Sequence, residues 1–307
     1  MSDLDSYPLF YQFKKNLGEN PMTMGLVNQM DLLTTRYGVE YLSLSERILN
    51  TLKKMDYDAF DTCQRYVYDY LIQMQKFLDT KKYGNGNYEK IKKNIYDNVD
   101  VMLKTYMPGL FLAYSTSSVL YTKFHLFKER LLPLLNNKLS GIEIGFGEGF
   151  YIWELSKCVQ GISITGFDIS EHALTFTSKL LEISNISSEN CRLLKENVID
   201  GLNVKNESFD FGILSEVIEH INKPEIAILE IARTLKSNGL LFLSTDINSN
   251  HMDHITNFES QEVVEELLTN CGFEVLYKSV YRIQDDLVNT KDITIGLSYI
   301  CKKLVKK

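Results

Sequence analysis

The stretch EIGFGEG at residues 143–149 decides how the second half of the chain folds, because it joins a short apolar run to an amphipathic segment. Its three glycines let the chain turn sharply and bring backbone N–H groups against a ligand at a helix N-terminus. Dinucleotide-binding loops have the spacing G-x-G-x-x-G, whereas here Phe150 occupies the position of their third glycine. The loop therefore predicts a nucleotide-type site that differs from a dinucleotide-binding site. Glu143, two residues ahead of Gly145, is a second feature that distinguishes the two kinds of site.

Outward from this loop, residues 138–307 alternate short apolar runs with amphipathic segments, which is the pattern of a parallel sheet with crossover helices. We expect strands at 142–145, 162–168, 192–195, 209–215, 240–245, 274–283 and 293–302, and helices at 149–158, 171–184, 224–237 and 260–271. The last two strands follow each other without a helix. This predicts an α/β fold with a doubly wound, seven-stranded, Rossmann-like sheet whose final strand is antiparallel.

The first half, residues 1–137, has apolar residues at three- and four-residue steps and predicts an all-α domain of five or six helices. Predicted breaks lie at 18–21, in KKYGNGNYEK at 81–90, and at Pro108-Gly109. The apolar stretch 110–135 is expected to be a helix that bridges the two halves.

Composition changes at the same place and supports two domains, 1–137 and 138–307. Fourteen of the 18 tyrosines precede residue 138, and the first half has 17 Lys and Arg against 15 Asp and Glu, while the second has 16 against 25. The overall charge of −7 and the short, separated lysine patches disfavour a nucleic-acid partner.

Location is predicted from what the sequence does not contain. Apolar runs stay below the roughly 18 residues that a membrane span needs, and MSDLDSYPLF opens with acidic residues rather than a basic secretory leader. The five cysteines are widely spaced and form no C-x-x-C. We therefore expect a cytoplasmic protein with reduced thiols and no membrane partner.

Asp168 ends the second expected strand in ITGFDIS, 23 residues after Gly145. A carboxylate at this place can accept hydrogen bonds from both hydroxyls of a ribose. The alternative is an ordinary aspartate that caps the helix starting near Glu171. The glycine loop in register with it favours the ribose.

Four motifs in this order, EIGFGEG, FDIS, FDFGILSEVIEHI and ARTLKSNGLLFLST, resemble the class I S-adenosylmethionine-dependent methyltransferases, especially their small-molecule branch. The resemblance covers about residues 138–303 and implies S-adenosylmethionine as cofactor. It implies that Glu143, Gly145, Gly147 and Gly149 hold the methionine portion, that Asp168 binds the ribose, that Ile169, Asn197 and Val198 lie at the adenine, and that Ser215 and Glu216 face the sulfonium. Asn197 departs from the family, which usually has an acid there.

The EVIEHI segment and the later TDINSNHMDHITNF follow adjacent strands, so their polar side chains are expected in one cleft. A helical EVIEHI would place Glu216 and His220 on one face. In one interpretation, Glu216, Glu219, His220 and His254 bind a divalent metal that acidifies an acceptor hydroxyl, as similar segments do in some related methyltransferases. In another, catalysis depends on His220, His254 and Glu216, with a histidine as general base. In the third, these residues only pack and order a loop.

The helical half is expected to cover the ligand-binding edge as a lid and to choose the acceptor. Tyr106, Tyr114, Tyr121 and Phe124 are the aromatic residues expected nearest to it. The alternative for tyrosines here is half-buried packing or a homodimer surface. Packing is favoured for Tyr66, Tyr68 and Tyr70, since three alternate residues cannot share one helix face.

The expected function is methyl transfer to a small molecule or short peptide, with O-methylation of a hydroxyl or carboxylate in secondary metabolism, that is natural product biosynthesis, preferred. N-methylation and metal-assisted C-methylation are the alternatives. A nicotinamide-dependent oxidoreductase and a cofactor-binding protein without catalysis are rivals from other classes.

Overall fold

The computed structural model describes residues 6–80, 91–249, 253–282 and 294–305. The C-terminal half is built on one seven-stranded sheet of order β3-β2-β1-β4-β5-β7-β6. Its strands are β1 (Ser140–Ile144), β2 (Ser163–Asp168), β3 (Cys191–Lys195), β4 (Phe209–Ser215), β5 (Leu235–Ile247), β6 (Phe273–Arg282) and β7 (Ile295–Lys303). Neighbours from β3 to β5 are parallel, and β7 runs antiparallel between β5 and β6. The predicted doubly wound sheet with an antiparallel last strand is confirmed.

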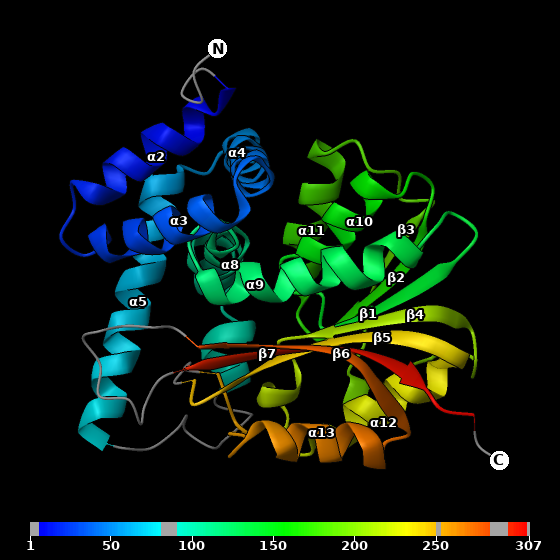
Figure 1. The fold of residues 1–307 in the computed structure, drawn as a ribbon. Coiled ribbons are helices and arrows are strands. Elements are labelled where there is room, and N and C mark those ends of the chain that lie inside the picture. The colour runs from blue at the N-terminus through cyan, green and yellow to red at the C-terminus, as the bar shows by residue number, and fades with distance from the viewer. Residues whose placement is uncertain (1–5, 81–90, 250–252, 283–293, 306–307) are drawn as a thin grey trace.

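Helices cover both faces of this sheet. They are α10 (Phe150–Cys158), α11 (Glu171–Ile183), α12 (Pro224–Thr234) and α13 (Gln261–Asn270), with short 3-10 turns η5 (Val198–Asp200) and η6 (Ile218–His220). Helices α10 and α11 lie on one face and α12 and α13 on the other (Figure 1). Helix α12 ends three residues before the predicted 237, because Leu235 is already extended and begins β5.

The first half is helical, as predicted. Its elements are α2 (Pro8–Gly18), α3 (Met24–Tyr37), α4 (Val39–Lys54), α5 (Ala59–Thr80), η1 (Lys92–Tyr96), α7 (Val99–Val101), η2 (Met102–Tyr106), α8 (Met107–Ala113), α9 (Ser118–Leu126), η3 (Phe127–Leu131) and η4 (Leu132–Leu134). The expected break at 18–21 falls between α2 and α3. The one predicted in 81–90 lies outside the described residues.

The break predicted at Pro108-Gly109 is wrong. Both residues are buried in α8, which follows η2 with no non-helical residue between them. The carbonyl of Leu103, in the turn before Pro108, accepts from the hydroxyl of Tyr57 at 2.7 Å. Gly109 is required by packing instead, since a Cβ there would lie 2.4 Å from the ring of Tyr66. The real break comes at residues 114–117, where the Ser117 hydroxyl accepts from the N–H of Leu120 and starts α9. The predicted bridging helix 110–135 is therefore divided.

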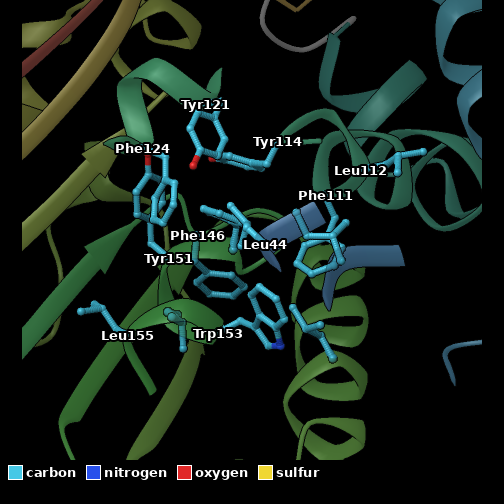
Figure 2. Packing of buried hydrophobic residues seen from close by; sticks show 14 of the residues in the cluster. Leu44, Phe111, Leu112, Tyr114, Tyr121, Phe124, Phe146, Tyr151, Trp153 and Leu155 are labelled. Atoms are coloured by element: carbon cyan, nitrogen blue, oxygen red, sulfur yellow. The ribbon is translucent and has the colours of Figure 1, made fainter. Parts of the chain in front are cut away.

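Aromatic residues join the helical half to the sheet half in one continuous core (Figure 2). The ring of Tyr114 stacks on that of Phe150 with centroids 3.5 Å apart, and Phe111 meets Trp153 edge to face at 5.2 Å. On the sheet side, Gly296 of β7 lies against α9, and a Cβ there would come within 2.5 Å of Val119. Its lack of a side chain allows α9 to approach the sheet closely.

A bidentate ion pair also links the halves. Arg47 of α4 donates to both carboxylate oxygens of Glu154 on α10, at 2.8 and 2.9 Å. The Glu154 side chain is 4% exposed, so Arg47 takes the place of water beside its carboxylate.

We therefore predict that Arg47→Met lowers the free energy of unfolding by about 2 kcal/mol, since Glu154 would lose a charged hydrogen-bond partner while staying buried. Urea unfolding followed by circular dichroism measures this. Arg65→Met is the matched control, because Arg65 pairs with Asp61 in a half-exposed pair on α5 and should change the value by less than about 0.5 kcal/mol. Equal effects of the two substitutions would contradict the assignment.

Candidate active site

The glycine loop has a backbone shape that other residues would strain. Gly145, Gly147 and Gly149 have φ values of 69°, 50° and 73°, all in the left-handed region. The N–H of Gly145 donates to the carbonyl of Phe167 at 2.7 Å, which ties the loop to the end of β2. A Cβ on Gly149 would also lie 2.4 Å from the side chain of Thr177. The loop is therefore held in one shape, directly ahead of α10.

Asp168 fastens the other side of this loop. Its carboxylate accepts from the N–H of Gly147 at 2.9 Å and from that of Ser170 at 2.7 Å. The residue that caps α11 is Ser170, whose hydroxyl accepts from Ala173, and not Asp168. Burial raises the pKa of Asp168, and its backbone donors act against that rise.

A cavity of about 740 Å³ opens between the carboxyl ends of the strands and the helical half. Most of the residues predicted for the site line it: Glu143, Gly145, Gly147, Asp168, Ile169, Asn197, Val198, Ser215, Glu216, His220, His254, Tyr106 and Tyr114. Gly149, Glu219, Tyr121 and Phe124 are outside this lining. Gly149 is the left-handed residue that directly precedes α10. Glu219 is fully buried, next to His220 in the chain.

The wall around the loop is acidic. Glu143 is 2% exposed, and its Oε2 accepts no hydrogen bond from the described residues. Burial, together with the charges of Glu148 and Asp168, raises the pKa of Glu143 well above its usual range. Burial also raises the pKa of Glu148 to about 7. Such a wall is suited to a ligand that brings positive charge.

One residue that the sequence analysis missed, Lys123 of α9, enters this region from the helical half. Its ammonium is bound to both oxygens of Glu216, at 2.7 and 2.8 Å, and to Asp246 at 2.6 Å. Lys123 is 1% exposed. A lone charge in the apolar segment SVLYTKFHL is the sequence signal that could have found it.

The expected helical EVIEHI segment is not formed. Only residues 218–220 make a 3-10 turn, and Glu216 has a φ of 53° at the end of β4. The Glu216 carboxylate also accepts from the hydroxyl of Ser244 at 2.6 Å. Since Lys123 and Ser244 occupy its oxygens, Glu216 is not grouped with the histidines, in contrast to the predicted metal set.

The other three residues of that set do come together. Glu219, His220 and His254 offer ligand atoms within 4.8 Å of one another, and the two imidazole rings are 4.9 Å apart. Glu219 accepts from the hydroxyl of Thr245 through Oε2, while its Oε1 accepts no hydrogen bond from the described residues. These atoms are of the kinds that bind divalent cations.

The tautomer of His220 follows from its surroundings. Its Nδ1 lies 3.0 Å from the carbonyl oxygen of Asp253, which can only accept, so Nδ1 carries a proton and Nε2 is the basic atom of the neutral ring. Burial lowers the pKa of His220, but the charges of Asp253 and Glu219 outweigh it and the pKa is raised.

Tyrosines form much of the cavity wall on the helical side. The hydroxyls of Tyr96 and Tyr106 donate to the carboxylate of Asp253. Tyr66 and Tyr70, one turn apart on α5, both line the cavity, while Tyr68 is exposed. Tyr121, which was predicted to lie near the acceptor, does not line the cavity. It is fully buried with its hydroxyl 3.4 Å from Glu40, away from the lining.

Buried Glu143 generates a prediction about pH. A carboxyl whose pKa is raised by folding contributes most to stability below its unfolded pKa, and that contribution is lost as pH rises through the folded pKa. The ligand-free protein should therefore lose more free energy of unfolding between pH 5 and pH 8 than Glu143→Gln does, as measured by urea unfolding at both values. Glu189→Gln, at an exposed site, is the control and should lose as much as the wild type. An unchanged loss in Glu143→Gln would contradict the pKa shift.

Comparison with known proteins places these features in a family. Residues 142–243 match the family model described as a methyltransferase domain. Two similar curated proteins are ubiquinone biosynthesis O-methyltransferases. The one from Glaesserella parasuis is 28% identical over 134 residues, covering 41% of this chain and 55% of the relative. The mitochondrial one from Candida albicans is 28% identical over 117 residues, covering 36% and 34%. The chain thus spans about a third to a half of the length of these relatives.

Solved structures agree on the fold. The [4+2]-cyclase SpnF has a TM-score of 0.51 at 15% identity, covering 62% of this chain and 83% of that chain. A putative sarcosine dimethylglycine methyltransferase from Galdieria sulphuraria has a TM-score of 0.51 at 14% identity, covering 60% and 86%. Together with the matched family model, the strand order and the glycine loop, these likenesses identify the C-terminal part of the chain as a class I S-adenosylmethionine-dependent methyltransferase domain, preceded by a helical N-terminal region.

Proposed function

We propose that this protein transfers a methyl group from S-adenosylmethionine to the hydroxyl oxygen of an uncharged small molecule. The observation that carries the proposal is the single cavity in which the acidic glycine-loop wall continues into a chamber of tyrosines and apolar side chains. The first part suits the cofactor, and the second suits an acceptor with an apolar or aromatic body.

The residues fit the cofactor in charge and in donor type. Glu143 has a buried oxygen that accepts no hydrogen bond from the part of the chain that the structure describes, and this oxygen suits the amino group of the methionine portion. Asp168 accepts backbone hydrogen bonds from Gly147 and Ser170, and a carboxylate with two oxygens has further lone pairs for ribose hydroxyls. Asn197 accepts from the N–H of Ile199 at 3.1 Å and starts η5, which fixes the backbone beside the adenine position. Bound there, the cofactor supplies a methyl group already activated by its positive sulfur.

Charge in the wall also indicates the acceptor. Among the described lining residues, Lys223 is the only lysine or arginine, against six carboxylates: Glu143, Glu148, Asp168, Glu196, Glu216 and Asp246. An anionic acceptor would be repelled, so a hydroxyl is favoured over the carboxylate that the sequence also allowed. The curated relatives are described as O-methyltransferases, which supports oxygen as the methylated atom.

In this mechanism the protein aligns the acceptor oxygen, the methyl carbon and sulfur, and excludes water. His220 lines the cavity with its basic Nε2 and is our choice for the group that takes the acceptor proton. A second interpretation is supported by the cluster of Glu219, His220 and His254, which could bind a divalent cation that acidifies the acceptor hydroxyl.

The cofactor assignment predicts that Asp168→Ala weakens binding of S-adenosylmethionine and of its demethylated product by about 10- to 100-fold, because charged hydrogen bonds contribute about 1.5–3 kcal/mol each. Isothermal titration calorimetry measures both affinities. Asp210→Ala is the control, since Asp210 also lies on a strand but binds Ser140 and Lys236 instead of lining the cavity. If the wild-type protein binds NADH and does not bind S-adenosylmethionine, the result would favour the alternative function, a nicotinamide-dependent oxidoreductase.

The base assignment predicts that His220→Gln lowers kcat by about 10²- to 10⁴-fold without weakening cofactor binding. The assay is transfer of labelled methyl from S-adenosylmethionine to a panel of uncharged phenols and alcohols. His172→Gln on α11, outside the cavity lining, should keep the wild-type rate.

Two further results separate the interpretations of the cluster. Loss of the wild-type rate in EDTA and its recovery with a divalent cation would support metal assistance. A rate unaffected by EDTA, in protein purified without chelator and free of metal, would leave His220 as base. A wild-type rate in His220→Gln would contradict both.

A further inference from the structure

The pair of carboxylates at the ends of β4 and β5 shares one buried cation. Glu216 and Asp246 both line the cavity, and the ammonium of Lys123 lies behind them, within 2.8 Å of three of their oxygens. The hydroxyl of Ser244 donates to Glu216 as well. Both oxygens of Glu216 and Oδ1 of Asp246 are therefore held in place before any ligand arrives.

The group has a definite charge. Burial lowers the pKa of Lys123, but Asp246 and Glu216 outweigh it and the pKa is raised, so the ammonium stays protonated. Two carboxylates and one ammonium leave a single net negative charge. A buried ion group of this kind is costly to desolvate and is weak evidence for a purely stabilising role.

Its position is defined by the strand order. The sheet runs β3-β2-β1-β4-β5, with the proposed adenine position at β3, the ribose at Asp168 of β2, and the methionine portion over the loop after β1. Glu216 and Asp246, at the ends of the next strands β4 and β5, line the same cavity and would face the sulfur that joins ribose to methionine.

We propose that Lys123 sets the charge of the methyl-transfer centre, holding it at one negative charge to match the single positive charge of the sulfonium. This rests on the proposed function. During transfer the S–CH₃ bond breaks and its electron pair stays on sulfur, an O–CH₃ bond forms with an electron pair of the acceptor oxygen, and the acceptor proton leaves to the base. Sulfur thereby becomes neutral. Excess negative charge nearby would bind the reactant more tightly than the transition state and slow the reaction.

Substitutions of Lys123 and Asp246 change the net charge of the group that they form with Glu216 one unit at a time. Lys123→Met leaves two negative charges, Asp246→Asn leaves none, and the double variant Lys123→Met with Asp246→Asn restores one. Lys123→Arg keeps the charge with another side chain. Lys128→Met is the matched control, because Lys128 follows on the same segment but pairs with Glu40 away from the cavity.

The probes are S-adenosylhomocysteine, which is neutral at sulfur, and sinefungin, which carries an ammonium in place of the methylated sulfur. The readout is the ratio of the Kd of S-adenosylhomocysteine to that of sinefungin, from calorimetry. We expect the ratio to rise about tenfold in Lys123→Met and to fall about tenfold in Asp246→Asn. The double variant, Lys123→Arg and Lys128→Met should stay near the wild-type value.

A ratio that is the same in every variant, or that depends on the presence of Lys123 and not on net charge, would overturn the proposal. Should Lys123→Met fail to fold by circular dichroism, Asp246→Asn and the double variant still differ by one charge and decide the matter. A wild type that binds neither probe would instead contradict the proposed function.

Discussion

Negative charge gathered at the carboxyl edge of the sheet is the constraint on which the rest of the site depends. Parallel strands deliver Glu143, Asp168 and Glu216 to one edge, and each is partly or wholly removed from water. Desolvated carboxylates repel one another, and burial raises the pKa values of Glu143 and Asp168. Backbone N–H groups compensate Asp168, and one buried lysine compensates Glu216. A positively charged ligand, such as the proposed cofactor, would compensate the remaining charge.

The sequence predicted well what depends on local pattern. The strands were found within a few residues because apolar runs and turn residues are short-range signals, and the loop at 145–149 was read from glycines whose positive φ values few other residues would tolerate. Asp168 followed from its register with that loop. These features need no knowledge of distant neighbours.

What the sequence did not predict depends on contacts between distant segments. Lys123 is 93 residues from Glu216 and 123 from Asp246, and only the packing of α9 on the sheet brings them together. Tyr66 and Tyr70 reach the cavity because α5 turns one face to it, whereas Tyr121 turns inward to Glu40. The break predicted at Pro108-Gly109 was wrong because the local pattern does not show that Gly109 packs against the ring of Tyr66 inside a helix. The fold alone also leaves the reaction open, since a [4+2]-cyclase has the same architecture.

Gly296 has a consequence for how this architecture could diversify. It pairs with Asp246 across β5 and β7, and its missing side chain sets how deeply α9 settles on the sheet. The helical region is thus not an interchangeable module attached to a finished domain. Any other helical region grafted onto this sheet would have to supply a cation at the same depth, or arrive together with changes at residues 216 and 246. Exchange of the helical region by recombination is for that reason restricted to partners that share this small contact.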